Sequence, residues 1–149
     1  MPPLLNALAL CERLPHTGRM CLLDCVVAWD EDGIHCTTLS HRKPDNPLRT
    51  VDGLPTVSGV EYAAQAMAVH GGLCAGHSAT RMGVLVAVRN LELHTNWLHE
   101  QQQELDIFAH KLRGDSSGGV YDVRVIAKEG ILLLSGRITV MYQSGGTTW

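Results

Sequence analysis

The chain has 149 residues, of which 45% are hydrophobic, and its formal net charge is −3. This length suits one domain with a well-formed core. The small net charge, the absence of a run of Lys or Arg and an aromatic content of only 5% argue against a nucleic-acid partner. No stretch of the sequence is long and apolar enough to span a membrane, so we expect no membrane partner.

The predicted elements begin with a short amphipathic helix at residues 6–13, ahead of Pro15. Two strands follow at residues 19–29 and 34–40, and the Asp-Glu-Asp-Gly turn at residues 30–33 joins them. Residues 42–55 hold three of the six prolines and are expected to form an irregular loop. The longest helix is predicted at residues 56–75, and four strands are predicted at residues 82–93, 103–112, 120–128 and 131–142.

This order of elements predicts an α+β chain with an antiparallel sheet and one helix that the sheet must cover. An antiparallel sheet of about six strands wrapped around one long central helix satisfies the order, and this architecture is the hotdog fold. We expect residues 1–149 to form a single hotdog domain.

The central helix carries one charged residue, Glu61, on an otherwise apolar surface. A helix that is apolar nearly all round is a buried one, so Glu61 is expected to be buried, with Gln65 one turn further along the same stripe. Burial favours the protonated form of a carboxylate and prepares it for acid–base chemistry. Residues 58–61 also match the capping-box pattern, in which Ser58 and Glu61 have a structural role. The sequence leaves both interpretations open.

Two segments resemble a known enzyme family. Leu14-Pro15-His16 is followed by Met20, Leu22, Leu23 and Asp24, and Pro55 is followed by Glu61-Tyr62-Ala63-Ala64-Gln65-Ala66. Both are similar to motifs of the hotdog-fold β-hydroxyacyl-acyl-carrier-protein dehydratases. The string from Gly59 to Gly71 resembles in particular the helix of the predicted dehydratases of aryl-polyene-type lipid clusters.

The resemblance implies dehydration of 3-hydroxyacyl thioesters carried on acyl carrier protein, in fatty-acid or polyene type lipid synthesis. In that family a histidine and a helix acid from opposite subunits of a dimer share the proton transfers. Backbone N–H groups at the helix start polarise the thioester carbonyl, assisted by the helix dipole.

The sequence departs from this family in the loop before the helix. Pro47 stands where the family has its loop histidine, no histidine lies between Asn46 and Pro55, and Thr56 replaces a glycine. Two histidines are candidates to substitute: His16, which matches the first family motif, and His41, which opens the loop. We expect catalytic roles for Glu61 and His16, and substrate binding by Gln65, Thr56, Val57 and His41.

The cysteines bear on location and on metal binding. Five cysteines without an export signal predict free thiols and a cytoplasmic location. Cys21 and Cys25 have no matching second pair for a zinc site, so we expect no metal. We also expect no cofactor.

The sequence is compatible with three functions. The first is the dehydratase, and the second is a hotdog acyl-thioesterase, a class that uses a helix carboxylate to activate water or to attack the thioester. The third is a non-catalytic acyl-binding partner subunit of an active dehydratase. The expected partners are an acyl carrier protein or coenzyme A thioester, and a second subunit in a homodimer or in a heterodimer with a related hotdog protein.

Overall fold

A computed structural model describes residues 21–76, 83–115 and 117–142 of the chain. It begins with strands β1 (Cys25–Asp30) and β2 (Gly33–Thr38) and a 3-10 turn, η2 (Ser40–Arg42). A second 3-10 turn, η3 (Thr56–Ser58), leads directly into the long helix α2 (Gly59–Cys74). The other elements are β3 (Gly83–Leu93), β4 (Leu105–Asp115), β5 (Gly118–Ala127), η4 (Lys128–Gly130) and β6 (Ile131–Tyr142). The helix expected at residues 6–13 lies outside the described residues.

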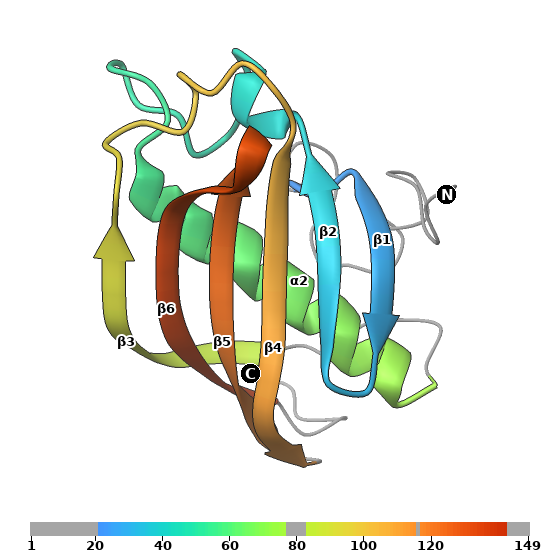
Figure 1. Ribbon diagram of the computed structural model, residues 1–149. Helices are drawn as coiled ribbons and strands as arrows, with labels where there is room; N and C mark the ends of the chain where they lie inside the picture. Colours follow the sequence, from blue (N-terminus) through green and yellow to red (C-terminus); the bar gives the residue numbers. More distant parts are fainter. Residues whose placement is uncertain (1–20, 77–82, 116, 143–149) are drawn as a thin grey trace.

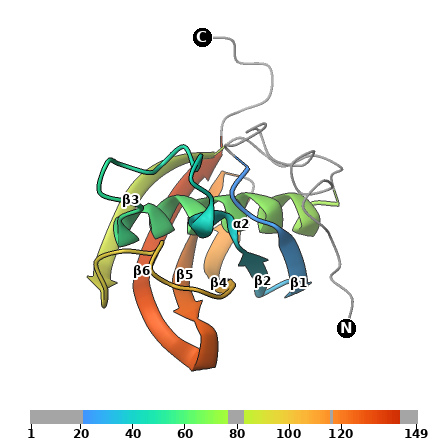
Figure 2. The same cartoon turned by 90° about the horizontal axis from the view of Figure 1, so that it is seen from above.

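The six strands form one antiparallel sheet in the order β1-β2-β4-β5-β6-β3. Figures 1 and 2 show α2 lying across one face of this sheet, which curves around it. The predicted hotdog architecture is therefore confirmed, and the four strands after the helix lie close to their expected positions.

The inner side of α2 supplies much of the core. Tyr62, Ala66 and Val69 are fully buried between the helix and the strands. The approach is close at Gly59, where an added Cβ would lie 3.0 Å from Leu134 Cδ1 and 3.2 Å from Val125 Cγ2. The small residues of this helix thus allow the sheet to come close.

The outer stripe of α2 is not covered by the sheet. Val60, Glu61, Ala64 and Ala68 are all partly exposed. Residues three and four positions apart share one side of a helix, and a single sheet covers only the opposite side. The expectation that Glu61 is buried is therefore wrong for this chain, because its side chain belongs to the uncovered stripe.

The first strand was predicted to begin at residue 19. Within the described part of the chain, it begins at Cys25. The preceding Leu22 is buried, and its N–H donates to Gln65 Oε1 at 3.0 Å. Its C=O accepts from Thr38 Oγ1 at 2.6 Å and from Ser40 Oγ at 2.7 Å. Side chains thus occupy both backbone groups that a sheet ladder would use, which explains why an apolar run does not extend the strand.

Cysteine chemistry differs from the prediction at one position. Cys25, Cys36 and Cys74 are free thiols, but Cys21 is disulfide-bonded, so the expectation of free thiols is wrong there. Burial raises the pKa of the Cys36 thiol to about 12, which marks it as a core residue. Across the described ranges, no group of three or more His, Cys, Asp or Glu side chains is placed to hold a metal ion. In the same ranges, no helix is long and apolar enough to cross a membrane.

Candidate active site

Glu61 and Gln65 form an acid–amide pair at the start of α2. Gln65 Nε2 donates to Glu61 Oε1 at 3.4 Å, and Gln65 Oε1 accepts from Leu22 N–H at 3.0 Å. Because a backbone N–H can only donate, it fixes the amide with its NH₂ group toward the carboxylate. Gln65 is buried, whereas Glu61 reaches the surface. Gln65 is therefore placed to orient Glu61, and the substrate binding expected of it stays a prediction.

The capping-box alternative is not realised. Ser58 makes no side-chain cap hydrogen bond. Its N–H, which the Glu61 carboxylate would need as a partner, donates to Pro55 O at 3.0 Å. The 3-10 turn η3 supplies this acceptor ahead of the helix. Glu61 therefore does not serve as the second half of a capping box.

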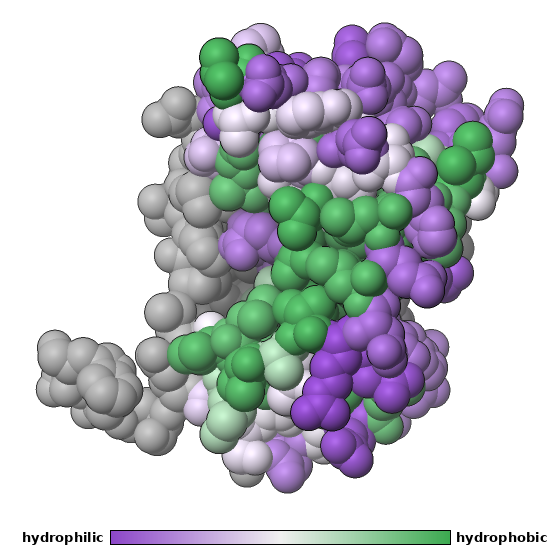
Figure 3. Space-filling model, turned by 90° about the vertical axis from the view of Figure 1, so that its left-hand side faces the viewer, coloured by the Kyte–Doolittle hydropathy of each residue, from purple (hydrophilic) through white to green (hydrophobic). Residues whose placement is uncertain are grey.

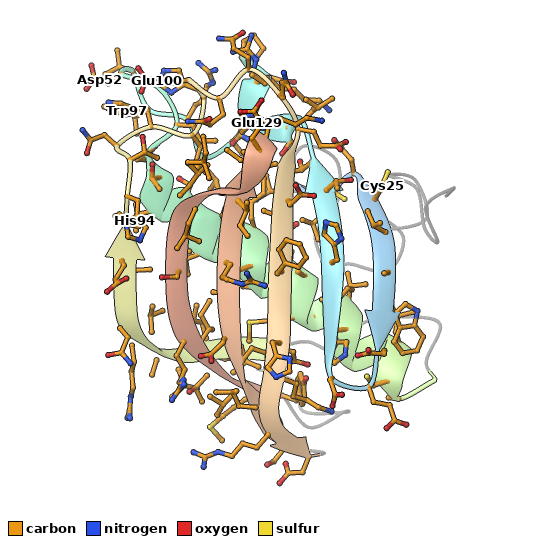
Figure 4. All side chains as sticks on the ribbon, viewed as in Figure 1. Cys25, Asp52, His94, Trp97, Glu100 and Glu129 are labelled. Atoms are coloured by element: carbon orange, nitrogen blue, oxygen red, sulfur yellow. The ribbon has the colours of Figure 1, made fainter. Side chains whose placement is uncertain are left out.

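Two irregular segments hold the start of the helix in place. Thr56 N–H donates to Asn96 O at 3.0 Å, and Leu98 N–H donates to Leu54 O at 2.9 Å. Figure 4 shows Trp97 at the end of the molecule where α2 begins. The loop before the helix and the loop before β4 are thus joined to each other, which fixes the position of η3.

The two site residues predicted at the helix start lie in different environments. Thr56 is buried, and its Oγ1 has no hydrogen-bond partner. Val57 is 48% exposed, and its N–H lies in the first turn, where no acceptor exists within the helix. Because Thr56 N–H is bonded to Asn96 O, the polarising contact expected at the helix start would have to come from Val57 N–H, and this role stays a prediction.

Of the two candidate histidines, only His41 belongs to the part of the chain that the structure describes. His16 lies outside the described residues. His41 is fully buried, and its Nε2 lies 3.0 Å from Gln101 O. Since a carbonyl only accepts, Nε2 carries the proton of the neutral ring. Burial lowers the pKa of His41, and this enclosed position favours a structural role that links η2 to the loop before β4.

His70 is a buried residue whose contacts the sequence did not reveal. Its Nε2 donates to Asp30 O at 2.8 Å, and its Nδ1 accepts from Tyr121 OH at 2.6 Å. It lies nine residues beyond Glu61 on α2, about 13.5 Å along the axis at 1.5 Å per residue. His70 therefore joins the far end of the helix to β1 and β5, away from the acid.

We expect the stability of the chain to fall in mild acid because two buried histidines take up protons when the chain unfolds. Burial lowers the pKa of both His41 and His70 from 6.5. Below about pH 6.5 the unfolded chain therefore binds more protons than the folded one, and the free energy of unfolding decreases as the pH falls. Thermal unfolding from about pH 7.5 to 5 measures this.

The matched variants for this pH dependence are His70→Gln and His110→Gln, of which the second changes an exposed histidine. His70→Gln should lower the melting temperature at pH 7 and flatten its decline in acid, because one buried group no longer titrates. His110→Gln should leave the decline unchanged. A decline equally steep in His70→Gln would contradict the assignment.

The edge strand β3 exposes apolar side chains on both of its faces. The β3 patch comprises Val84, Leu85, Val86, Leu91 and Leu93 of this strand and Met141 of β6. Figure 3 shows an extended hydrophobic area on this side of the molecule. The other edge strand, β1, is only 6 residues long and has a bulge between Val26 and Ala28. A long edge strand with a cluster of exposed apolar side chains is typical of a subunit interface. β3 has both features, although its pairing with β6 is also irregular between Leu85 and Ala87 and between Arg89 and Glu92.

Comparisons with known proteins show to which family this chain belongs. The family model of the ApeP-like proteins, described as ApeP dehydratase, matches residues 8–147. The dehydratase heterocomplex ApeI:P from Xenorhabdus doucetiae is similar in structure, with a TM-score of 0.79 and 22% sequence identity over 97% of this chain and 93% of that chain. A search of curated protein sequences gave no match.

More distant structures share the fold. A thioesterase from Haemophilus influenzae has a TM-score of 0.58 and 16% identity, over 83% of this chain and 80% of that one. The PaaI protein of the Escherichia coli phenylacetic acid degradation operon has a TM-score of 0.56 and 13% identity, over 79% and 81% of the two chains. The family match covers most of the chain and the sheet and helix agree with it, so this chain is a hotdog-fold protein that belongs to the ApeP-like dehydratase family.

Proposed function

We propose that this chain dehydrates 3-hydroxyacyl thioesters. The observation that carries the proposal is the Glu61 carboxylate, oriented by Gln65 at the positive end of α2 and close in sequence to the first-turn N–H of Val57. In the reaction a base takes the α-proton, and the electron pair left on the α-carbon forms the new double bond. The bond from C3 to the hydroxyl oxygen breaks, and an acid protonates that oxygen to give water.

The proposed roles follow from where the described residues lie and, for His16, from the family motif alone. Glu61 carries out one proton transfer, and His16 or a histidine of a second subunit carries out the other. Val57 N–H polarises the thioester carbonyl, as a backbone donor does in an oxyanion hole. The buried Thr56 and His41 support the walls of the substrate site, and Gln65 orients the acid.

The proposed substrate carrier is acyl carrier protein, with coenzyme A as the alternative. Arg42 and Lys43 are exposed next to the loop before α2, where they can meet an acidic carrier or a pantetheine phosphate. Figure 4 places Asp52 and Glu100 at the same end, so the charge there is mixed and shape must contribute to recognition. The proposed location is cytoplasmic: the free thiols of Cys25, Cys36 and Cys74 favour it, whereas the disulfide at Cys21 does not.

We further propose that the β3 patch binds a second hotdog subunit. Pairing of two β3 edges would cover the apolar side chains and satisfy the open backbone groups of the strand. The similar structure from Xenorhabdus doucetiae is the dehydratase heterocomplex ApeI:P, which supports a related hotdog protein as the partner. A homodimer remains the alternative, and light scattering of the pure chain and of the mixture distinguishes the two.

An assay with two readouts tests the proposed reaction. The chain, alone and with its hotdog partner, is mixed with a 3-hydroxyacyl carrier protein while the ultraviolet absorbance of the enoyl thioester and the release of thiol are followed. A rise in enoyl absorbance without thiol supports the dehydratase. Release of thiol without enoyl product supports the thioesterase. The thioesterase is the second candidate because Pro47 stands where the dehydratase family has its loop histidine.

A further inference from the structure

Asn46 anchors the loop before α2 to the helix itself. Its Oδ1 accepts from Leu48 N–H at 2.9 Å, which fixes the orientation of the amide. Its Nδ2 donates to Ser40 O at 2.9 Å and to Tyr62 OH at 3.0 Å. Asn46 directly precedes Pro47, the position where the resembling family has its loop histidine. The loop is therefore held by a hydroxyl of the residue that follows Glu61.

The proton positions in this cluster follow from what each atom can accept. The Asn46 NH₂ group cannot accept, so Ser40 Oγ, 2.8 Å away, is the acceptor for the Tyr62 O–H. The Ser40 hydroxyl then donates to Leu22 O at 2.7 Å. Hydrogen bonds thus run in one direction from Asn46 through Tyr62 and Ser40 to the Leu22 carbonyl.

The same Leu22 residue connects this cluster to the candidate acid. Its N–H holds Gln65 Oε1, and Gln65 Nε2 donates to Glu61 Oε1. Thr38 Oγ1 also donates to Leu22 O at 2.6 Å, so this segment is held on both sides. A displacement of Leu22 would therefore change the direction of the Gln65 amide and, with it, the carboxylate.

We infer that Tyr62 is a positioning residue that sets the orientation of Glu61 through Ser40, Leu22 and Gln65. This inference deepens the proposed function and rests on it for the consequence in turnover. A phenylalanine would fill the same buried space without a hydroxyl to satisfy, so packing alone does not require tyrosine here. Burial raises the pKa of Tyr62, which keeps the phenol protonated and able to donate.

The test compares Tyr62→Phe with Tyr121→Phe. Both tyrosines are almost completely buried, and each donates one hydrogen bond, but Tyr121 donates to His70 at the far end of α2. Each variant is assayed for kcat and KM with the partner subunit present. The carboxyl resonance of Glu61 is recorded by NMR with carboxyl-labelled glutamate, and it is assigned from its loss in Glu61→Gln.

Tyr62→Phe should lower kcat about five- to ten-fold, with little change in KM, and should shift the Glu61 resonance. Tyr121→Phe should change neither quantity. In a Gln65→Ala background the kcat loss from Tyr62→Phe should largely disappear, because the path to Glu61 is already broken. Ser40→Ala, which removes the donor to Leu22 O, serves as the second variant if Tyr62→Phe does not fold.

The NMR readout does not depend on activity. If wild type has no dehydratase activity but Tyr62→Phe still shifts the Glu61 resonance, the proposed function fails and the positioning role stands. An unshifted Glu61 resonance in both Tyr62→Phe and Ser40→Ala would overturn the positioning role, as would equal losses of kcat in Tyr62→Phe and Tyr121→Phe.

Discussion

Glu61→Gln is expected to lower turnover by roughly 10²- to 10⁴-fold, the range for loss of a general acid or base. The amide keeps the shape of the side chain and an oxygen that can accept from Gln65 Nε2, but it cannot exchange a proton. Since Glu61 is partly exposed, loss of its charge should change the melting temperature little. Enoyl-thioester formation and thermal unfolding of the same preparation measure the two effects.

The matched control for this change is Glu100→Gln, which removes an exposed carboxylate at the same end of the molecule. It should retain full turnover. Glu61→Ala adds a second comparison: the loss of about 0.5–2 kcal/mol that accompanies removal of a helix cap is not expected, because no capping box forms at Ser58. Full turnover in Glu61→Gln would contradict the catalytic role of Glu61.

Val86→Lys is expected to abolish association with the second subunit. The side chain is 53% exposed in the middle of the β3 patch, so lysine should leave the isolated fold intact. Its charge would have to be desolvated on pairing, and natural edge strands use lysine to prevent such contacts. Light scattering of the variant, alone and mixed with its partner, measures the loss, and turnover should fall with it.

Val51→Lys is the control, since Val51 is completely exposed in the turn between Thr50 and Gly53 and lies outside the β3 patch. It should associate as wild type does. If Val86→Lys forms the same complex as wild type, the interface lies elsewhere on the molecule.

The order of the elements could be predicted from the sequence because it depends on local signals. The turn at residues 30–33, the prolines before the helix and the alternating strands after it place the elements from β2 onward within a few residues. The start of β1 could not be predicted, since it depends on Leu22 binding Gln65, 43 residues away. Burial of Glu61 was mispredicted because helix composition shows an apolar surface but not which stripe the sheet covers.

Part of the candidate site could also be predicted, because the spacing of residues along one helix is a local signal. The spacing of Glu61 and Gln65 put them on one stripe, and the structure joins them by a hydrogen bond. The positioning cluster around Tyr62 was not predictable, because Asn46, Ser40 and Leu22 come from separate segments that meet only in the folded chain. Likewise, the sequence shows that His41 is the first residue of the loop before the helix. It could not show that the His41 ring is hydrogen-bonded to the Gln101 carbonyl.

The most direct test of the proposed dehydration by Glu61 is hydration, the reverse reaction, in water enriched in heavy oxygen. The chain and its partner subunit are incubated with an enoyl carrier-protein thioester, and the product is analysed by mass spectrometry. Dehydratase chemistry at Glu61 predicts one heavy oxygen in the C3 hydroxyl of an intact thioester, and almost none when Glu61→Gln replaces the wild-type chain. Heavy oxygen in a released carboxylic acid, or equal labelling of the hydroxyl by Glu61→Gln, would contradict it.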